Sequence, residues 1–257
     1  MEKTNFVSPL SRRYVGQSIR GATDRQQRLP GFNQSVFSSS SVVCIGAGGL
    51  ISQIAPTLVR KGIGALTILD DDVVEPSNLN RQRFYPKDIG LNKAYALAEN
   101  LLCECVNATT LTAHPFLLED AIDNGIDLGC DVAICGVDNN PARIAASAYF
   151  RKHNIPVIFT AVSADADHGY VFIQEHAGPC FGCLFPGAVD SQTYACPATP
   201  AIAEILQMVG ALAVYGVDTC LTSRRRNWNF RRIYLSGQEW EVGVVIKIRP
   251  GCCLVTH

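Results

Sequence analysis

A glycine-rich turn between a strand-like run and a helix-like run is the feature of this sequence that points most directly to chemistry. In VVCIGAGGLISQ, residues 42–53, Gly46, Gly48 and Gly49 stand at that turn. Because glycine has no Cβ, backbone N–H groups and the positive end of the helix can approach a phosphate there. The dinucleotide fingerprint has its third glycine where this chain has Ile51, so that match is incomplete. The turn predicts a nucleotide phosphate site, and glycines used only for tight packing are the alternative.

Three acidic residues follow the next strand-like run in ALTILDDD, residues 65–72. Asp70 stands at about the spacing from the glycine turn at which an acid hydrogen-bonds ribose hydroxyls. This acid strengthens the prediction of a nucleoside site without choosing between NAD and ATP. Asp71 and Asp72 either neighbour a metal or cap the following turn.

Further polar motifs follow in a specific order. The segment LDDDVVEPSNLNRQRFYPKDIGLNKAYALAENL contains Asn78, Arg81, Gln82 and Lys93, and CGVDNNPAR contains Asp138 and Arg143. These motifs resemble the ThiF/MoeB/HesA family, the prokaryotic relatives of the ubiquitin-activating enzymes. The pattern of that family runs GxGGxG, DxDxVxxSNLxRQ, G-x-x-K and D-N-x-x-R. The resemblance covers residues 24 to about 255.

The resemblance implies a role for each matching side chain. It places Asp70 at the ribose of ATP, with Asp72 and Gln82 as supporting residues of the nucleotide site, Asn78, Arg81 and Lys93 at the phosphates, and Asp138 at magnesium. The physical argument agrees, because attack of a carboxylate on the α-phosphorus brings two anions together and expels pyrophosphate. Such a site needs fixed cations and a metal directed at the developing charge. Surface salt bridges on ordinary helices are the alternative for each charged residue.

An arginine before the first long strand suggests a dimer. TDRQQRLPGFNQ, residues 23–34, is similar to the family's RQ element, in which the arginine reaches into the ATP site of the other subunit, and Arg25 is the match. RYVGQ, residues 13–17, mimics the element but has Gly16 where an arginine is wanted. The resemblance therefore implies a homodimer, and a flexible basic N-terminus is the alternative.

Cysteines suggest a zinc site. GPCFGCLFPG contains Cys180-x-x-Cys183, and in the family such a pair joins a second CxxC near the C-terminus to hold structural zinc. Here the chain ends in RPGCCLVTH, with Val255 where the last cysteine is expected. Tetrahedral zinc can take Cys180, Cys183, Cys252 and either Cys253 or His257. The alternative is that the metal has been lost and these are buried thiols.

Cys196 lies at the end of PGAVDSQTYACPATP, which corresponds to the mobile crossover loop of relatives. In some relatives a cysteine at this place takes the activated acyl group. A thiolate at a helix N-terminus is more acidic and more available, because the helix dipole stabilises its charge. Cys196 is thus a candidate nucleophile, with a structural role as the alternative.

Alternating strand and helix patterns must position these residues. The fold class predicted is α/β, with a Rossmann-like sheet that is parallel in its first half and has a C-terminal antiparallel extension and a crossover loop. Residues 1–23 are predicted to be an N-terminal extension, and residues 24–257 one adenylation domain. Its nucleotide-binding half covers about 36–165, and its cysteine-containing, crossover-loop and C-terminal half about 166–257. The elements expected are strands at 42–45, 65–72, 131–140, 155–162, 169–174, 230–236 and 241–248, and helices at 50–61, 93–102, 142–153 and about 199–215.

Composition limits the partners and the compartment. The 257 residues are 47% hydrophobic, enough for a buried core, and a net charge of −1 supplies no field that would attract nucleic acid or an anionic membrane. The arginines at 224–226, 231 and 232 are interpreted as a solvated edge, with an acidic partner as the alternative. No signal peptide and no apolar run long enough to cross a bilayer are predicted, which favours the cytoplasm. In the cytoplasm, eleven cysteines indicate reduced thiols, metal ligands or catalysis. The cysteines outside the zinc and crossover segments are expected in or near the core.

The function predicted is a magnesium- and ATP-dependent adenylyltransferase that activates the C-terminal glycine carboxylate of a ubiquitin-like or sulfur-carrier protein. The substrate protein is implied by resemblance alone, as is onward transfer through a thioester or persulfide, to a conjugating enzyme or with a sulfur donor. Two alternatives remain. One is an NAD(P)-dependent oxidoreductase on a Rossmann domain, which leaves the SNLNRQ segment without a role. The other is a non-catalytic dimeric scaffold.

Overall fold

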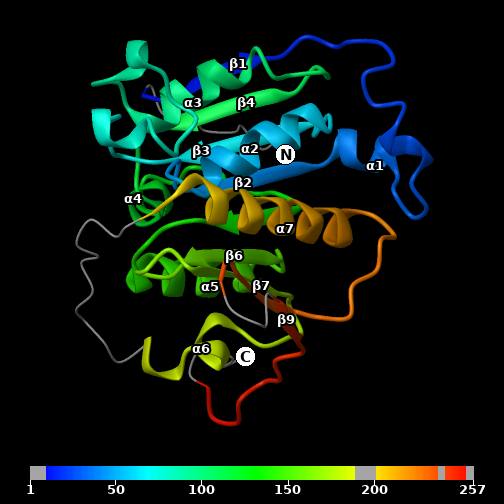
Figure 1. The fold of residues 1–257 in the computed structure, drawn as a ribbon, viewed down its shortest axis with the longest axis vertical. Helices are drawn as coiled ribbons and strands as arrows, with labels where there is room; N and C mark the ends of the chain where they lie inside the picture. The colour runs from blue at the N-terminus through cyan, green and yellow to red at the C-terminus, as the bar shows by residue number, and fades with distance from the viewer. Residues whose placement is uncertain (1–9, 189–200, 237–240, 253–257) are drawn as a thin grey trace.

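A central sheet organises the computed structural model, which describes residues 10–188, 201–236 and 241–252. The described residues form nine strands in the order β1-β4-β3-β2-β5-β6-β7-β8-β9 (Figure 1). Their bounds are β1 Arg12–Val15, β2 Ser41–Ile45, β3 Ala65–Leu69, β4 Thr110–His114, β5 Val132–Cys135, β6 Val157–Val162, β7 His168–Gln174, β8 Phe230–Tyr234 and β9 Glu241–Val244. The helices are α1 Gln34–Ser39, α2 Ile51–Arg60, α3 Lys93–Leu101, α4 Leu118–Asp123, α5 Asn140–Lys152, α6 Phe181–Leu184 and α7 Ala203–Leu221.

The direction of the strands confirms the predicted fold class. Strands β4, β3, β2, β5 and β6 are parallel, and β7, β8 and β9 continue the sheet in antiparallel fashion. After β1 at the edge of the sheet, the chain enters the middle at β2, moves outward through β3 to β4 and then returns to β5 on the other side of β2. The carboxyl ends of β2 and β5 therefore form a topological switch point, where open α/β sheets leave a crevice for a ligand.

Two elements at the sheet's first edge had no counterpart in the expected series of strands. Strand β4 pairs in parallel with β3, and β1 pairs antiparallel with β4 in the register Arg12 to Ala113. Residues 12–15, which the sequence places in an N-terminal extension, are thus paired in the main sheet. At the other edge, β9 ends at Val244, earlier than the apolar run 241–248 suggests.

Helices cover both faces of the sheet. Alternating strand residues separate the two faces: Cys44, Ile68 and Ile134 pack under α2, α3 and α7, whereas Ile45, Cys135 and Phe159 pack under α4, α5 and α6. Because parallel strands are covered on both faces, their sequences are nearly continuous apolar runs. The cysteines expected in or near the core divide by the same geometry: Cys44, Cys105 and Cys135 are buried, Cys130 and Cys220 are half-buried, and Cys103 is exposed, which corrects its assignment.

Helix α7 is longer and more apolar than expected. It runs from Ala203 to Leu221 with a mean hydropathy of 1.3, so it is long and apolar enough to span a membrane, contrary to the prediction that no such run exists. Half of it is buried, and it packs beside α2 across β6 and β7 (Figure 1). Gly216 lets the helix approach the sheet, since a Cβ there would meet Ile173 at 3.1 Å. The apolar composition of α7 is thus that of a core helix.

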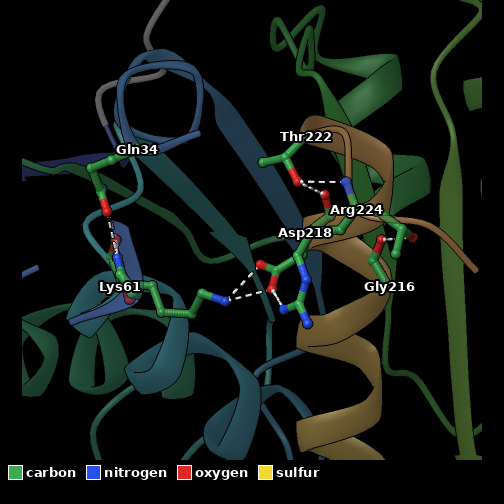
Figure 2. A network of polar contacts seen from close by, with 8 residues as sticks. Gln34, Lys61, Gly216, Asp218, Thr222 and Arg224 are labelled. Atoms are coloured by element: carbon green, nitrogen blue, oxygen red, sulfur yellow. Dashed lines mark hydrogen bonds and ion pairs between the residues drawn. The ribbon is translucent and has the colours of Figure 1, made fainter. Parts of the chain in front are cut away.

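A buried carboxylate joins α7 to α2 (Figure 2). The Asp218 side chain is 2% exposed, and Lys61 Nζ donates to its two oxygens at 2.6 and 2.7 Å. Arg224 Nη1 donates to the same carboxylate at 3.0 Å. The prediction of a solvated arginine edge was therefore wrong for Arg224, and equally for Arg226, which pairs with Glu175.

The same lysine holds the segment that follows Arg25. The Lys61 carbonyl oxygen accepts hydrogen bonds from Gln26 Nε2 at 2.7 Å and from Gln34 Nε2 at 3.0 Å. The Lys61 ammonium group also lies 5.0 Å from the ring centroid of Phe32. These contacts anchor residues 26–34 at the C-terminal end of α2.

Candidate active site

A cavity of about 1060 Å³ opens at the carboxyl ends of the parallel strands. Its walls come from the turns after β2, β3, β5 and β6, and from residues 181–188. The predicted nucleotide and magnesium residues all line it: Gly46, Gly48, Gly49, Asp70, Asp72, Asn78, Arg81, Gln82, Lys93 and Asp138. Residues separated by up to 92 positions thus surround one space, at the switch point where a ligand is expected.

The three glycines differ in what they permit. Gly46 has φ +93°, which disfavours any residue with a Cβ. A Cβ on Gly48 would have no atom within 4 Å and would project into open space, which leaves room for a ligand at this turn. A Cβ on Gly49 would meet Leu206 of α7 at 2.9 Å, so this glycine allows helix packing. Gly49 therefore has the packing role, and the phosphate site at Gly46 and Gly48 stays a prediction.

Asp70 closes the glycine turn from the end of β3. Its carboxylate accepts from the Ala47 N–H at 2.6 Å and from the Asp72 N–H at 2.9 Å. Burial raises the pKa of Asp70 to about 6, while the Ala47 hydrogen bond and the nearby Lys93 charge act against that rise. A carboxylate held in this way is ionised above about pH 6 and is positioned to accept from hydroxyl groups of a bound ligand.

Two cations lie on the walls beside Asp70. Lys93, the first residue of α3, has a side chain that is 12% exposed, and its Nζ lies 2.8 Å from Asp72 Oδ2. Arg81 Nη1 donates to the Ser77 carbonyl at 2.7 Å and to Asn80 Oδ1 at 3.0 Å. Both groups keep further N–H donors for an anion in the cavity, because an ammonium group has three and a guanidinium group five.

Asn78 and Gln82 form the buried part of the same wall. Asn78 Oδ1 accepts from the Glu75 N–H at 2.9 Å and so shapes the short helix Pro76–Asn78. Gln82 is buried, and its Oε1 has no hydrogen-bond partner among the described residues. A buried amide oxygen without a partner costs free energy, and a donor from a bound ligand would remove that cost.

The turn after β5 contributes the remaining charges. Asp138 is exposed and lines the cavity, and Asn139 caps α5 by accepting from the Ala142 N–H at 2.9 Å. Arg143, noted in the sequence only as part of a motif, also lines the cavity, and its Nε and Nη2 donate to the Val137 carbonyl at 3.1 and 2.8 Å. Helix α5 therefore presents a fixed guanidinium group near Asp138.

An aromatic and apolar wall that the sequence did not indicate completes the cavity. Tyr170 of β7 packs against Phe185 with ring centroids 5.4 Å apart, and Phe181 lies 5.1 Å from Phe185. Leu184 and Leu206 complete this wall. Its residues come from β7, from the segment around α6 and from α7, which no local sequence pattern joins. The cavity thus has a charged end and an apolar end.

The cysteine cluster lies apart from this cavity. The Sγ atoms of Cys180, Cys183 and Cys252 lie within 4.8 Å of one another, with Cys180 Sγ 3.6 Å from Cys183 Sγ and 3.4 Å from Cys252 Sγ. Zinc–sulfur bonds of 2.3 Å in a tetrahedron separate the sulfur atoms by about 3.8 Å, so this donor set fits zinc. The Arg249 N–H donates to Cys183 Sγ at 3.3 Å. Burial and the neighbouring thiols raise the pKa of Cys180 to about 12.

Some predicted residues are not at the cavity. Arg25 is exposed and does not line it, so the predicted reach of its side chain into a second subunit stays a prediction. Cys196, Cys253 and His257 lie outside the described residues.

The sheet order and the glycine turn at its switch point define a Rossmann-like α/β protein. The sequence profile of the ThiF family matches residues 23–243. The chain therefore belongs to the ThiF family.

Curated relatives share this part of the chain. The SAMP-activating enzyme E1 of Haloferax volcanii is 31% identical over 182 residues, covering 67% of this chain and 63% of that protein. The adenylyltransferase and sulfurtransferase UBA4 of Yarrowia lipolytica is 30% identical over 72% of this chain and 46% of its own length. Ubiquitin-like modifier-activating enzyme 5 of Drosophila ananassae is 34% identical over 57% of this chain and 40% of its own length. The chain thus matches about two fifths to two thirds of the length of these relatives.

Solved structures share the fold. MccB of E. coli has a TM-score of 0.71 at 20% identity, over 87% of this chain and 69% of that chain. PaaA has a TM-score of 0.65 at 20% identity, over 82% of this chain and 75% of that chain. At this level of identity the likeness supports the fold and not the chemistry.

Proposed function

We propose that this protein is an adenylyltransferase that uses ATP to activate the C-terminal glycine carboxylate of a ubiquitin-like or sulfur-carrier protein. The observation that carries the proposal is the single cavity in which the glycine turn, Asp70, Arg81, Lys93 and Asp138 converge. The names of the relatives agree, since one is called a SAMP-activating enzyme and another an adenylyltransferase and sulfurtransferase.

The reaction and the charges of the cavity correspond. A carboxylate oxygen of the carrier forms a bond to the α-phosphorus of ATP, and the bond from that phosphorus to pyrophosphate breaks, which gives an acyl-adenylate. Arg81 and Lys93 stabilise the phosphate charge as the two anions approach, and Asp70 accepts from ribose hydroxyls. Asp138 is the proposed magnesium ligand. Magnesium, when bound, neutralises charge on the phosphate oxygens.

The apolar end of the cavity is the proposed site for the carrier's extended C-terminal tail. An alternative NAD(P)-dependent oxidoreductase leaves Arg81, Lys93 and Asp138 without a role, and a non-catalytic scaffold does not need them. We also propose the homodimer and the reach of Arg25 into the partner's site. The exposure of Arg25, next to the anchored Gln26, supports this proposal.

Exchange of labelled pyrophosphate into ATP tests the activity. The protein with Mg-ATP is expected to catalyse exchange only when a carrier ending in a C-terminal glycine is added, because the label returns to ATP only through the acyl-adenylate. The same carrier with its last glycine removed is the control. Exchange independent of any carrier, or none with any ubiquitin-like or sulfur-carrier protein, would contradict the proposal.

Onward capture of the acyl group by Cys196 would appear as a carrier adduct that thiol reductant removes. The absence of such an adduct would mean that the reaction stops at the acyl-adenylate.

We further propose that Cys180, Cys183 and Cys252 bind structural zinc, with Cys253 or His257 as the fourth ligand. Purified protein is expected to contain about one zinc per chain, and Cys252→Ser is expected to lose zinc and to lower the melting temperature. The physical reason is that metal bound only to the folded state adds its binding free energy to folding. Metal analysis and thermal unfolding measure both effects.

The exposed Cys103 supplies the matched control. Cys103→Ser is expected to keep the metal and the melting temperature. Protein from zinc-replete medium without stoichiometric metal would leave the three cysteines as a buried thiol cluster.

A further inference from the structure

Two arginines near Tyr170, Arg143 on the cavity wall and Arg232 on β8, are given no part in the proposed adenylation step. Arg143 lines the cavity, and two of its N–H groups are held by the Val137 carbonyl. Arg232 lies on β8 directly opposite Tyr170 of β7, so both side chains stand on the same face of the sheet. Neither arginine forms an ion pair with a carboxylate of the described residues.

Arg232 does not itself line the cavity, and aromatic rings lie between its guanidinium group and the cavity wall. Its guanidinium carbon lies 5.6 Å from the ring centroid of Phe230, and Phe230 lies 5.6 Å from Tyr170, which lines the cavity. Arg232 Nη1 lies 3.3 Å from Tyr234 Oη, and Arg232 Nε is buried without a hydrogen-bond partner among the described residues. Donors of this guanidinium group thus remain available.

The charges of Arg143 and Arg232 both act on the phenol of Tyr170. Burial raises the pKa of Tyr170, and the charges of Arg143 and Arg232 lower it. The hydroxyl group therefore stays protonated at neutral pH and can donate a hydrogen bond. Glu119 also lines the cavity, but its carboxylate lies more than 4 Å from either guanidinium group. No carboxylate of the described residues lies within ion-pair distance of either arginine.

Strand spacing gives the distance from the reacting centre. The boundary between β7 and β8 lies three strand positions from the switch point between β2 and β5, or about 14 Å at 4.8 Å per strand. An extended chain advances about 3.4 Å per residue, so about four residues cover this distance. A ligand whose C-terminus lies at the glycine turn would place a side chain four residues earlier beside Tyr170.

From this arrangement we infer that Arg143, Tyr170 and Arg232 form a specificity subsite for an acidic side chain, Asp or Glu, about four residues before the C-terminal glycine of the carrier. This inference rests on the proposed function, because it takes the carrier's tail as the ligand. It narrows the substrate class to carriers with an acidic residue in the tail.

Peptide binding tests the subsite separately from catalysis. The probes are fluorescein-labelled decapeptides with a free C-terminal glycine and Glu, Gln or Lys four residues before it, mixed with the protein and a magnesium complex of a non-hydrolysable ATP analogue. Fluorescence anisotropy measures the dissociation constants. The Glu peptide is expected to bind about tenfold more tightly than the Gln peptide, because charge-assisted hydrogen bonds are lost with Gln.

A charge reversal at Arg232 sharpens the test. Arg232→Glu is expected to favour the Lys peptide over the Glu peptide, whereas Arg231→Ala, on the opposite face of β8, is expected to keep the wild-type preference. Thermal unfolding of both variants establishes that they fold. Equal binding of the three peptides, no binding of any, or a preference unchanged in Arg232→Glu overturns the inference. Pyrophosphate exchange with the same peptides tests the proposed function. Equal exchange rates with the Glu, Gln and Lys peptides contradict the subsite but support the proposed function.

Discussion

Arg81→Ala is expected to slow carrier-dependent ATP–pyrophosphate exchange by about 10²-fold or more. Arg81 lines the cavity and is held at the Ser77 carbonyl and Asn80, so its guanidinium group is oriented before any nucleotide binds. Removing one preorganised donor directed at developing charge costs on the order of 10²–10³-fold in rate. Steady-state exchange rates at saturating Mg-ATP and carrier measure the effect.

The neighbouring Arg83 supplies the matched control. It is exposed, does not line the cavity, and donates to Gln53 Oε1 at 3.3 Å. Arg83→Ala therefore removes the same charge two residues away and is expected to keep the exchange rate within about twofold. Equal rates for the two variants would place the phosphates elsewhere in the cavity.

Asp218→Ala is expected to lower the free energy of unfolding by about 3–5 kcal/mol, because removing one member of a buried ion pair leaves its partner charged and uncompensated. Lys61 is the partner most affected, since its side chain is 18% exposed and both carboxylate oxygens contact its Nζ. Arg224, at 26% exposed, retains more access to water. Denaturant unfolding monitored by circular dichroism measures the change.

Replacing both buried partners separates the loss of an interaction from the cost of a stranded charge. Lys61→Met with Asp218→Leu is expected to recover most of the stability lost in Asp218→Ala, since apolar replacements of buried pairs are often nearly neutral. Asp165→Ala is the control, because that carboxylate is 70% exposed and the nearest basic side chain, His168, lies 4.0 Å away. A loss below 1 kcal/mol in Asp218→Ala would show that water reaches the pair.

Local spacing in the sequence was enough to predict the fold class, and the family resemblance added the set of polar residues that line one wall of the cavity. A short apolar strand, a glycine turn and a helix lie within about 20 residues, so their arrangement follows from backbone geometry. The motif order at Asn78, Arg81, Lys93 and Asp138 predicted that these residues would meet, because each follows the carboxyl end of a parallel strand or opens the next helix. The short strand β4 was not predicted, since TLTAH mixes polar and apolar residues.

Contacts between distant segments were decided only by the tertiary structure. The packing role of Gly49 depends on Leu206, more than 150 residues later, and the pairing of Lys61 with Asp218 joins two helices with no common motif. The Cys180–Cys252 approach could be proposed from a family resemblance, but its 3.4 Å distance depends on how the C-terminal segment returns to α6. The juxtaposition of Arg143, Tyr170 and Arg232 arises from strand pairing and the start of α5. Spacing in the sequence determines the relative positions only of side chains a few residues apart. Sheet order and helix packing bring remote side chains within a few ångströms of one another.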